Sequence, residues 1–256
     1  MPPPDASTLL FAVVGDIHGR FLRLERWLEA LEQARGRQVN FVLAVGDVEA
    51  FESADDHRRK AAKRTLPAEF AEYAQGVRHF PRPLYFIGGN NEDFASLDGM
   101  PDGGTLAPNV HYLGRAGTVD REGLAIAYLS GIYAPRFIDA PLEPPTSAVK
   151  AKQAGYFRTS DLERLRGASR ADLMLLHEWP RGLVRRVQGG LKLRAHRFPW
   201  IGNPVVREGV ARIRPSWLFC GHSHVHWPPR SNFRKVASPA WPAWTRLPVR
   251  KEPCFG

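Results

Sequence analysis

The chain has 256 residues, of which 43% are hydrophobic, and its formal net charge is +10. That length is enough for one large hydrophobic core, so we expect a single α/β domain over residues 1–256. Only two cysteines occur, Cys220 and Cys254, and they are far apart, which excludes a thiolate cage as the basis of any metal site.

The N-terminus and the apolar runs bear on the compartment. Residues 1–5 lack the basic-then-apolar layout of a secretion signal. No apolar run approaches the roughly 20 residues that span a bilayer. We therefore predict a reducing cytoplasm and no membrane role.

The positive charge is concentrated in the C-terminal part of the chain. From His177 to Lys251 there are fifteen Arg or Lys residues, against only Glu178 and Glu208. Such a region attracts polyanions if the charges share one face. A well-solvated surface is the alternative, and the sequence leaves both open.

Five short apolar runs each end at or just before a polar residue that can bind a metal. These pairs are Leu9–Val14 with Asp16, Phe41–Val45 with Asp47, Leu84–Ile87 with Asn90, Leu173–Leu176 with His177, and Trp217–Cys220 with His222. Continuous apolar runs of this length predict strands buried on both faces. Open α/β folds place their sites at the C-terminal ends of such strands.

Two helices are predicted in the first third of the chain. Apolar residues recur at helical spacing from Phe21 to Leu31, and Gly36 follows as a stop, which predicts a strand–helix–strand unit. A second helix is expected over Asp55–Gln75, interrupted by Pro67. Its basic cluster at residues 58–64 is expected to be a solvated face rather than a binding site.

Later segments alternate between turns and regular elements. Thr118–Gly131 is typical of two short strands around a turn at residues 121–123. The proline-punctuated stretch Tyr133–Lys150 fits neither period and predicts a long loop. Asn203 followed by Pro204 predicts the start of a helix that runs through Arg212.

The candidate ligands form a mixed set of oxygen and nitrogen donors. In chain order they are Asp16, His18, Asp47, Asn90, His177, His222 and His224. Carboxylate, imidazole and amide ligands suit divalent cations, with manganese expected first and iron, zinc or cobalt as alternatives. Two adjacent cations can activate water and stabilise charge on a phosphoryl group, so the set predicts phosphoester hydrolysis.

In their order these motifs resemble the metallophosphoesterase (calcineurin-like) superfamily, whose pattern is Asp-x-His, Gly-Asp, Gly-Asn-His-Glu, a lone His and Gly-His-x-His. The resemblance implies a β-sandwich flanked by helices in four αββα layers. It also implies a dinuclear site with one cation on Asp16, His18 and His224 and the other on Asn90, His177 and His222. Asp47 would bridge the two cations.

From about Phe11 to His226 the chain is also similar to RNA lariat debranching enzymes. The motifs that carry this similarity are residues 86–90, 106–114, 129–133, 177–182 and 202–204. The resemblance implies a nucleic-acid phosphodiester substrate and a substrate-recognition loop over residues 132–156. Tyr133, Arg136 and Arg181 are then candidate substrate-binding residues, and a lid without substrate contacts is the alternative.

The chain departs from these patterns at two positions. Debranching enzymes typically have cysteine where Asp16 stands, so the first metal position here resembles the ordinary dinuclear type. Asn91 occupies the position of the histidine that usually protonates the leaving oxygen, and asparagine cannot titrate. A general acid typically contributes about 10²–10⁴ in rate. His226 is a candidate replacement, although a histidine at that place is more often a supporting or surface residue.

Three functions follow from these features. The first is a metal-dependent phosphodiesterase that acts on nucleic acid or a nucleotide. The second, suggested by Asn91, is a weakened metal-binding pseudoenzyme that binds nucleic acid. The third, a phosphoprotein phosphatase, is disfavoured because Gly46-Asp47 continues with Val48-Glu49-Ala50 and not with Asp-Arg-Gly. The oligomeric state stays open.

Overall fold

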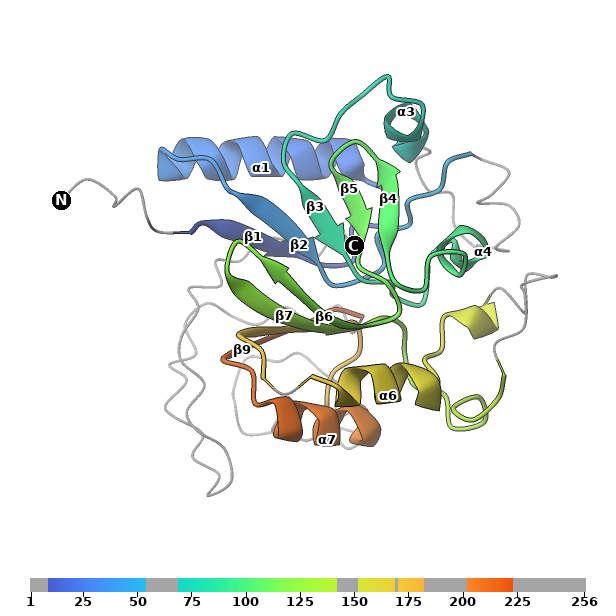
Figure 1. The fold of residues 1–256 in the computed structure, drawn as a ribbon. Coiled ribbons are helices and arrows are strands. Elements are labelled where there is room, and N and C mark those ends of the chain that lie inside the picture. The colour runs from blue at the N-terminus through green and yellow to red at the C-terminus, as the bar shows by residue number, and fades with distance from the viewer. Residues whose placement is uncertain (1–8, 54–68, 142–151, 169, 182–201, 223–256) are drawn as a thin grey trace, which may run out of the picture.

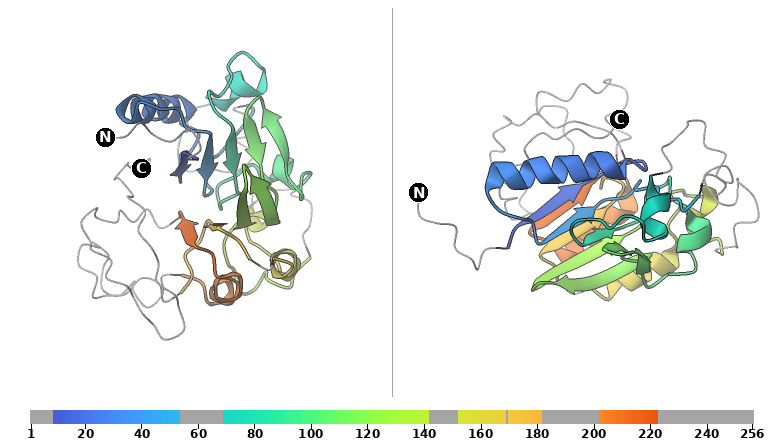
Figure 2. Two further views of the ribbon diagram at one scale, coloured as in Figure 1. Left: turned by 60° about the vertical axis from the view of Figure 1, so that its left-hand side comes forward. Right: turned by 90° about the horizontal axis from the view of Figure 1, so that it is seen from above.

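The computed structural model of the protein describes residues 9–53, 69–141, 152–168, 170–181 and 202–222. Two β-sheets pack face to face, and helices cover the outer face of each sheet (Figure 1). The views of Figure 2 show the same layering from two further directions, with α1 on one side of the sandwich and α6 and α7 on the other. The predicted four-layer αββα fold is confirmed.

The first sheet has the strand order β1-β2-β3-β5-β4. Its strands are β1 (Phe11–Val14), β2 (Phe41–Ala44), β3 (Leu84–Phe86), β4 (Gly104–Ala107) and β5 (Val110–Tyr112). All neighbours are parallel except β4, which runs antiparallel to β5. The three strands predicted in this part of the chain are therefore adjacent, and their C-terminal ends meet at one edge.

The second sheet has the order β6-β7-β8-β9. It consists of β6 (Ala116–Arg121), β7 (Leu124–Leu129), β8 (Leu173–Leu176) and β9 (Trp217–Cys220). The predicted hairpin is confirmed, because β6 pairs antiparallel with β7 across a two-residue turn. The remaining neighbours are parallel, so β8 and β9 also end at one edge.

The helices join the strands in chain order. They are α1 (Phe21–Arg35), α3 (Phe70–Ala74), α4 (Phe94–Leu97), α6 (Thr159–Arg166) and α7 (Pro204–Ile213). As predicted, α1 links two parallel strands and ends at Gly36, whose φ of 62° is left-handed. The prediction for α7 is also confirmed, since the Asn203 side chain accepts hydrogen bonds from the amides of Val205 and Val206. Of the range 55–75 expected to be helical, residues 69–75 are described and contain α3, and the basic cluster at residues 58–64 lies outside the described residues.

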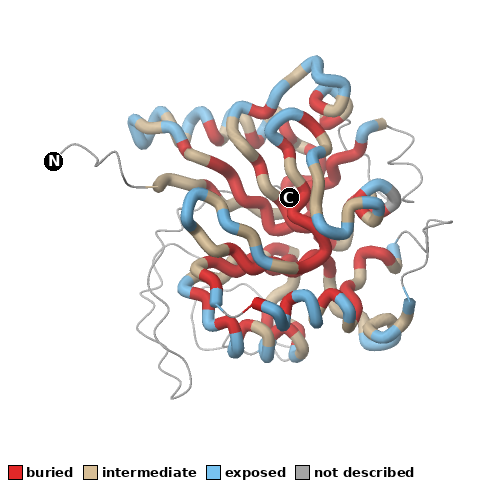
Figure 3. The backbone as a smooth tube through the Cα atoms, viewed as in Figure 1, coloured by how far each residue is buried: buried red, intermediate tan, exposed pale blue. Residues whose placement is uncertain are grey.

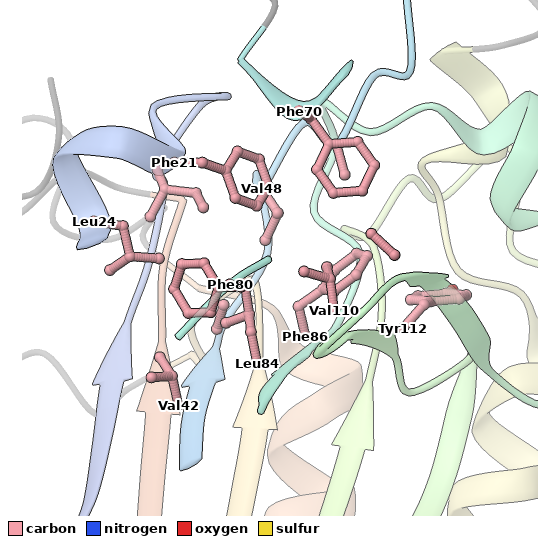
Figure 4. Packing of buried hydrophobic residues seen from close by; sticks show 14 of the residues in the cluster. Phe21, Leu24, Val42, Val48, Phe70, Phe80, Leu84, Phe86, Val110 and Tyr112 are labelled. Carbon is pink, nitrogen blue, oxygen red and sulfur yellow. The ribbon is translucent and has the colours of Figure 1, made fainter. Parts of the chain in front are cut away.

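Three apolar layers hold the fold together, because strands buried on both faces alternate their side chains between two cores. Val42 and Leu84 point toward α1, where Phe21 and Leu24 lie over them (Figure 4). Leu43, from the opposite face of β2, packs between the two sheets. A third cluster joins the second sheet to α6 and α7. The central strands β2 and β8 are accordingly buried along their whole length, and the helices expose their outer sides (Figure 3).

The two ends of the segment 132–156 lie side by side. The Ile132 amide donates to the Gly155 carbonyl at 3.0 Å, and the Phe157 amide donates to the Ile132 carbonyl at 3.1 Å. Residues 132–141 contain no helix or strand, in agreement with the predicted loop, and residues 142–151 lie outside the described part. Among the described helices, none is long and apolar enough to cross a membrane.

Candidate metal centre

The polar residues that follow the predicted strands meet at one edge of the sandwich. The loop after β1 runs beside the loop after β2, since the Asp16 amide donates to the Gly46 carbonyl at 3.0 Å and the His18 amide to the Asp47 carbonyl at 2.9 Å. The two sheets meet here as well, because His177 Nδ1 lies 2.7 Å from the Val45 carbonyl oxygen. The site is thus built from both sheets.

Two groups of potential ligands share one carboxylate. Asp16, His18 and Asp47 form the first group, and Asp47, His177 and His222 form the second, with the ligand atoms of each group within 4.8 Å of one another. Asn90 extends the second group, since its Oδ1 lies 3.3 Å from His177 Nε2. A shared carboxylate between two groups is the arrangement that can bridge two cations.

Hydrogen bonds fix the orientation of the ligand side chains. The Nδ1 of His177 bonds to a carbonyl, so this nitrogen carries the proton and Nε2 is left to face Asp47, whose Oδ1 is 3.4 Å away. The Asp16 carboxylate accepts the His222 amide at 3.0 and 3.2 Å, which holds the loop after β9 against the loop after β1. Hydrogen bonds to a backbone carbonyl and from a backbone amide therefore orient these side chains.

The backbone is strained at the ligand positions. Asp16, His18, Asp47 and His222 all have left-handed φ angles, between 48° and 67°. Such angles are uncommon for residues other than glycine and cost free energy, and they persist where surrounding contacts impose them, typically at functional sites. Here the strain coincides with the candidate ligands.

Two glycines allow the strand ends to approach one another. A Cβ on Gly46, whose φ is 92°, would lie 2.5 Å from Nδ1 of His177. A Cβ on Gly89 would lie 2.8 Å from Nε2 of His177 and closer still to the Asp47 carboxylate. A side chain at Gly46 would collide with the ring of His177, and one at Gly89 would occupy the space between Asp47 and His177.

Comparison with known proteins identifies the family of the chain. The model of the calcineurin-like phosphoesterase family matches residues 9–226. The chain belongs to this family. The range of the match includes every strand and every ligand described above.

Among curated proteins, this calcineurin-like phosphoesterase is similar to proteins named lariat debranching enzyme. It is 30% identical to that of Danio rerio over 226 residues and 31% identical to that of Drosophila melanogaster over 225 residues. It is 30% identical to that of Caenorhabditis briggsae over 234 residues. These alignments cover 83–84% of this chain but only 40–46% of the relatives, so the chain spans less than half of their length.

The donor set of this site fits divalent cations. Burial alone would raise the pKa of Asp47, but the charge of His177 and the hydrogen bonds from His177 and Asn91 outweigh it and hold that pKa well below its usual range. Burial lowers the pKa of His177, and Asp47 outweighs this effect and raises it to about 9. Asp47 thus holds a positive charge beside it, and a cation can take the place of the imidazole proton.

Glu92 is a supporting residue to which the sequence motifs assigned no role. Its side chain is buried, and Oε1 accepts the amides of Val48 at 2.8 Å and Gly89 at 3.1 Å, while Oε2 accepts the amide of Glu49 at 2.8 Å. It thereby joins the loop that carries Asp47 to the loop that carries Asn90. The sequence signal that could have revealed this supporting role is the position of the glutamate directly after the Asn90-Asn91 pair.

Asn91 faces the shared carboxylate. Its amide donates to Asp47 Oδ1 and its side-chain Nδ2 donates to Asp47 Oδ2, both at 2.8 Å. Both of these hydrogen bonds end on the same carboxylate. This contact also could not be read from the motif, because 44 residues separate the two partners.

The predicted substrate-binding residues differ in their exposure to solvent. Arg136 and Arg181 are exposed, and the Arg181 amide donates to the Asn203 carbonyl at 3.0 Å. Tyr133 is half-buried and stacks its ring on Phe157, with the centroids 5.9 Å apart. His224 and His226 lie outside the described residues.

Proposed function

We propose that this chain is a metal-dependent phosphodiesterase that hydrolyses nucleic-acid or nucleotide phosphodiesters through a dinuclear metal site. The observation that carries the proposal is the pair of ligand groups that share Asp47 at the edge of the two sheets. Family membership supports the reaction class. The whole chain, residues 1–256, would form one catalytic domain.

The proposed ligands divide between two cations. Asp16 and His18, with His224, would hold one, and His177 and His222, with the Asn90 amide oxygen, would hold the other, while Asp47 would bridge them. When bound, two such cations supply Lewis-acid activation of the phosphoryl group and of the attacking water. Manganese is the first candidate, and iron, zinc or cobalt are also compatible with these donors.

The residues around the ligands would orient the site rather than react. The Val45 carbonyl holds His177 with Nε2 inward, and Glu92 keeps the two loops in register. The Asn91 bonds hold both oxygens of Asp47 in one orientation. Because Asn91 cannot give up a proton, protonation of the leaving oxygen falls to another group, for which His226 is the candidate.

The segment 132–156 is the proposed substrate-recognition element, and the proximity of its return end to the candidate ligand Asn90 supports this role. A Cβ on Gly155 would lie 3.3 Å from the Asn90 backbone, so these two segments are in close contact. The buried Arg115 holds that end through the carbonyls of Ala154 and Tyr156 at 2.8 and 2.9 Å. Tyr133, Arg136 and Arg181 are proposed substrate contacts.

The relatives suggest which phosphodiester is cleaved. Because the curated relatives are named lariat debranching enzymes, we propose a branched nucleic acid as the first substrate to try. The fifteen basic residues between His177 and Lys251 favour a polyanion. A cytoplasmic location remains a prediction.

A weakened, metal-binding pseudoenzyme that retains nucleic-acid binding is the second candidate. The observation that favours it is Asn91, whose side chain is bonded to Asp47 where the family pattern has a proton donor. The two candidates differ in turnover and not in metal binding.

The test is a parallel assay of four substrates by the manganese-loaded chain. They are a branched RNA, a linear single strand, a cyclic nucleotide and an aryl phosphodiester. We expect cleavage of at least one nucleic-acid substrate, with the branched RNA preferred. Binding of nucleic acid without cleavage of any of the four would favour the pseudoenzyme.

A further inference from the structure

Glu49 is a buried carboxylate beside the metal ligands and is not a member of either ligand group. Its side chain is 3% exposed, and its Oε1 lies 2.6 Å from Nδ1 of His18, which is 1% exposed. An imidazole N–H and a carboxylate at this distance form a charge-assisted hydrogen bond. The pair therefore links the loop after β2 to the first ligand group.

The contact determines which nitrogen of His18 is available. A carboxylate can only accept, so His18 Nδ1–H donates the hydrogen bond to Glu49. The lone pair is then on Nε2, which is the nitrogen that can bind a cation together with Asp16 and Asp47. A carboxylate on the far nitrogen of a histidine ligand fixes the ring orientation and strengthens the remaining nitrogen as a donor.

The backbone of Glu49 shares the strain of the ligands. Its φ is 56°, close to the 51° of Asp47, two residues before it. Glutamate adopts this conformation rarely. The Glu49 amide is fixed by Glu92 Oε2 at 2.8 Å, and its carbonyl accepts the Phe51 amide at 2.9 Å. These contacts hold the Glu49 side chain toward His18 and not toward solvent.

From this geometry we infer that Glu49 is a positioning residue for His18, and that it sets the affinity of the first metal position without binding the cation. The inference rests on the metal centre of the proposed function. It predicts that the length of the side chain at this position matters as well as its charge. An acceptor at the right distance must keep His18 in place, and a carboxylate that is too short must not.

The experiment compares four variants of the full chain by manganese titration. We expect Glu49→Ala to lower manganese affinity at one of two positions by about 10–100-fold. Glu49→Asp, which withdraws the carboxylate by one methylene, should lose affinity as well. Glu49→Gln keeps an oxygen acceptor at full length and should retain more affinity than either. Glu52→Gln, a change at an exposed glutamate three residues away, is the matched control and should bind as the wild type does.

Electron paramagnetic resonance gives a second readout that a merely structural role would not change. At equal manganese, the wild type should show a coupled pair and Glu49→Ala a single ion. Wild-type affinity at both positions in Glu49→Ala would overturn the inference. If that variant does not fold, the remaining comparison decides, because Glu49→Asp binding as tightly as Glu49→Gln would overturn it too. A wild-type chain that takes up no manganese would instead overturn the proposed function, so the two failures are distinct.

Discussion

Replacement of Glu92 by glutamine probes the contact that joins the two ligand loops. The carboxylate is 2% exposed and accepts three backbone amides, two on Oε1 and one on Oε2. Glutamine has the same length but only one acceptor oxygen. Whichever way its amide turns, its NH2 group faces at least one of the three donors.

The size of the effect follows from those bonds. A buried donor left without a partner costs about 1–3 kcal/mol, and the bonds that remain lose the contribution of the negative charge. We therefore expect Glu92→Gln to lower the free energy of unfolding by about 2–4 kcal/mol. This is a large part of the roughly 5–15 kcal/mol of a typical domain. Manganese affinity should fall too, because Asp47 and Asn90 lose their common support.

Urea denaturation of the metal-free chain measures the first effect, as a shift of the midpoint at an unchanged slope. Manganese titration of the folded variant measures the second. Glu52→Gln is the control, since it removes one negative charge from an exposed position. A loss below about 0.5 kcal/mol, the scale of an ordinary surface change, together with unchanged manganese affinity would refute the reasoning.

Three further predictions concern other positions. Gly89→Ala should weaken manganese binding by about 10-fold or more, because its Cβ would crowd Asp47 and His177, and unchanged titration curves would argue against a site between these residues. Asn91→His should raise turnover on a phosphodiester with a poor leaving group by up to about 10²-fold, and no gain with metals still bound would mean that Asn91 does not replace an acid. Burial raises the pKa of Asp98 to about 6, against the opposing effect of Arg115. Between about pH 4 and pH 6 the native state therefore keeps a proton on Asp98 that the unfolded state has lost, and the free energy of unfolding falls as the pH rises. Asp98→Asn should remove this slope and stabilise the chain at pH 7 by up to about 3 kcal/mol, and denaturation midpoints at pH 4 and pH 7 provide the check.

The edge of the sandwich at which the candidate ligands lie was predictable, because it depends on short local stretches of sequence. Apolar runs such as Phe41–Val45 are long enough to define buried strands, and each delivers its polar residue at the C-terminal end. The helix start at Asn203 was predictable for the same reason, since its cap and its proline lie side by side in the sequence.

The supporting contacts were not predictable, because they join residues that are distant in the chain. Glu92 binds amides 43 and 44 residues away, and Glu49 contacts a histidine 31 residues away. An isolated acidic residue is most often exposed, so only the folded structure shows that these two are buried. The strands β4 and β5 were not predicted for another reason. Gly104–Ala107 and Val110–Tyr112 are too short to show a clear hydrophobic period.

The most direct test of the proposed metal-dependent phosphodiesterase is hydrolysis of bis-p-nitrophenyl phosphate by the manganese-loaded chain, measured beside Asp47→Asn. Asp47 is the carboxylate shared by both ligand groups, so its loss should affect both cations. We predict steady hydrolysis by the wild type, dependent on added metal, and a fall of at least about 10²-fold in the variant, as for the loss of a directly participating group. Equal rates for the two proteins, or no hydrolysis by a wild type that has bound two manganese ions, would contradict the account.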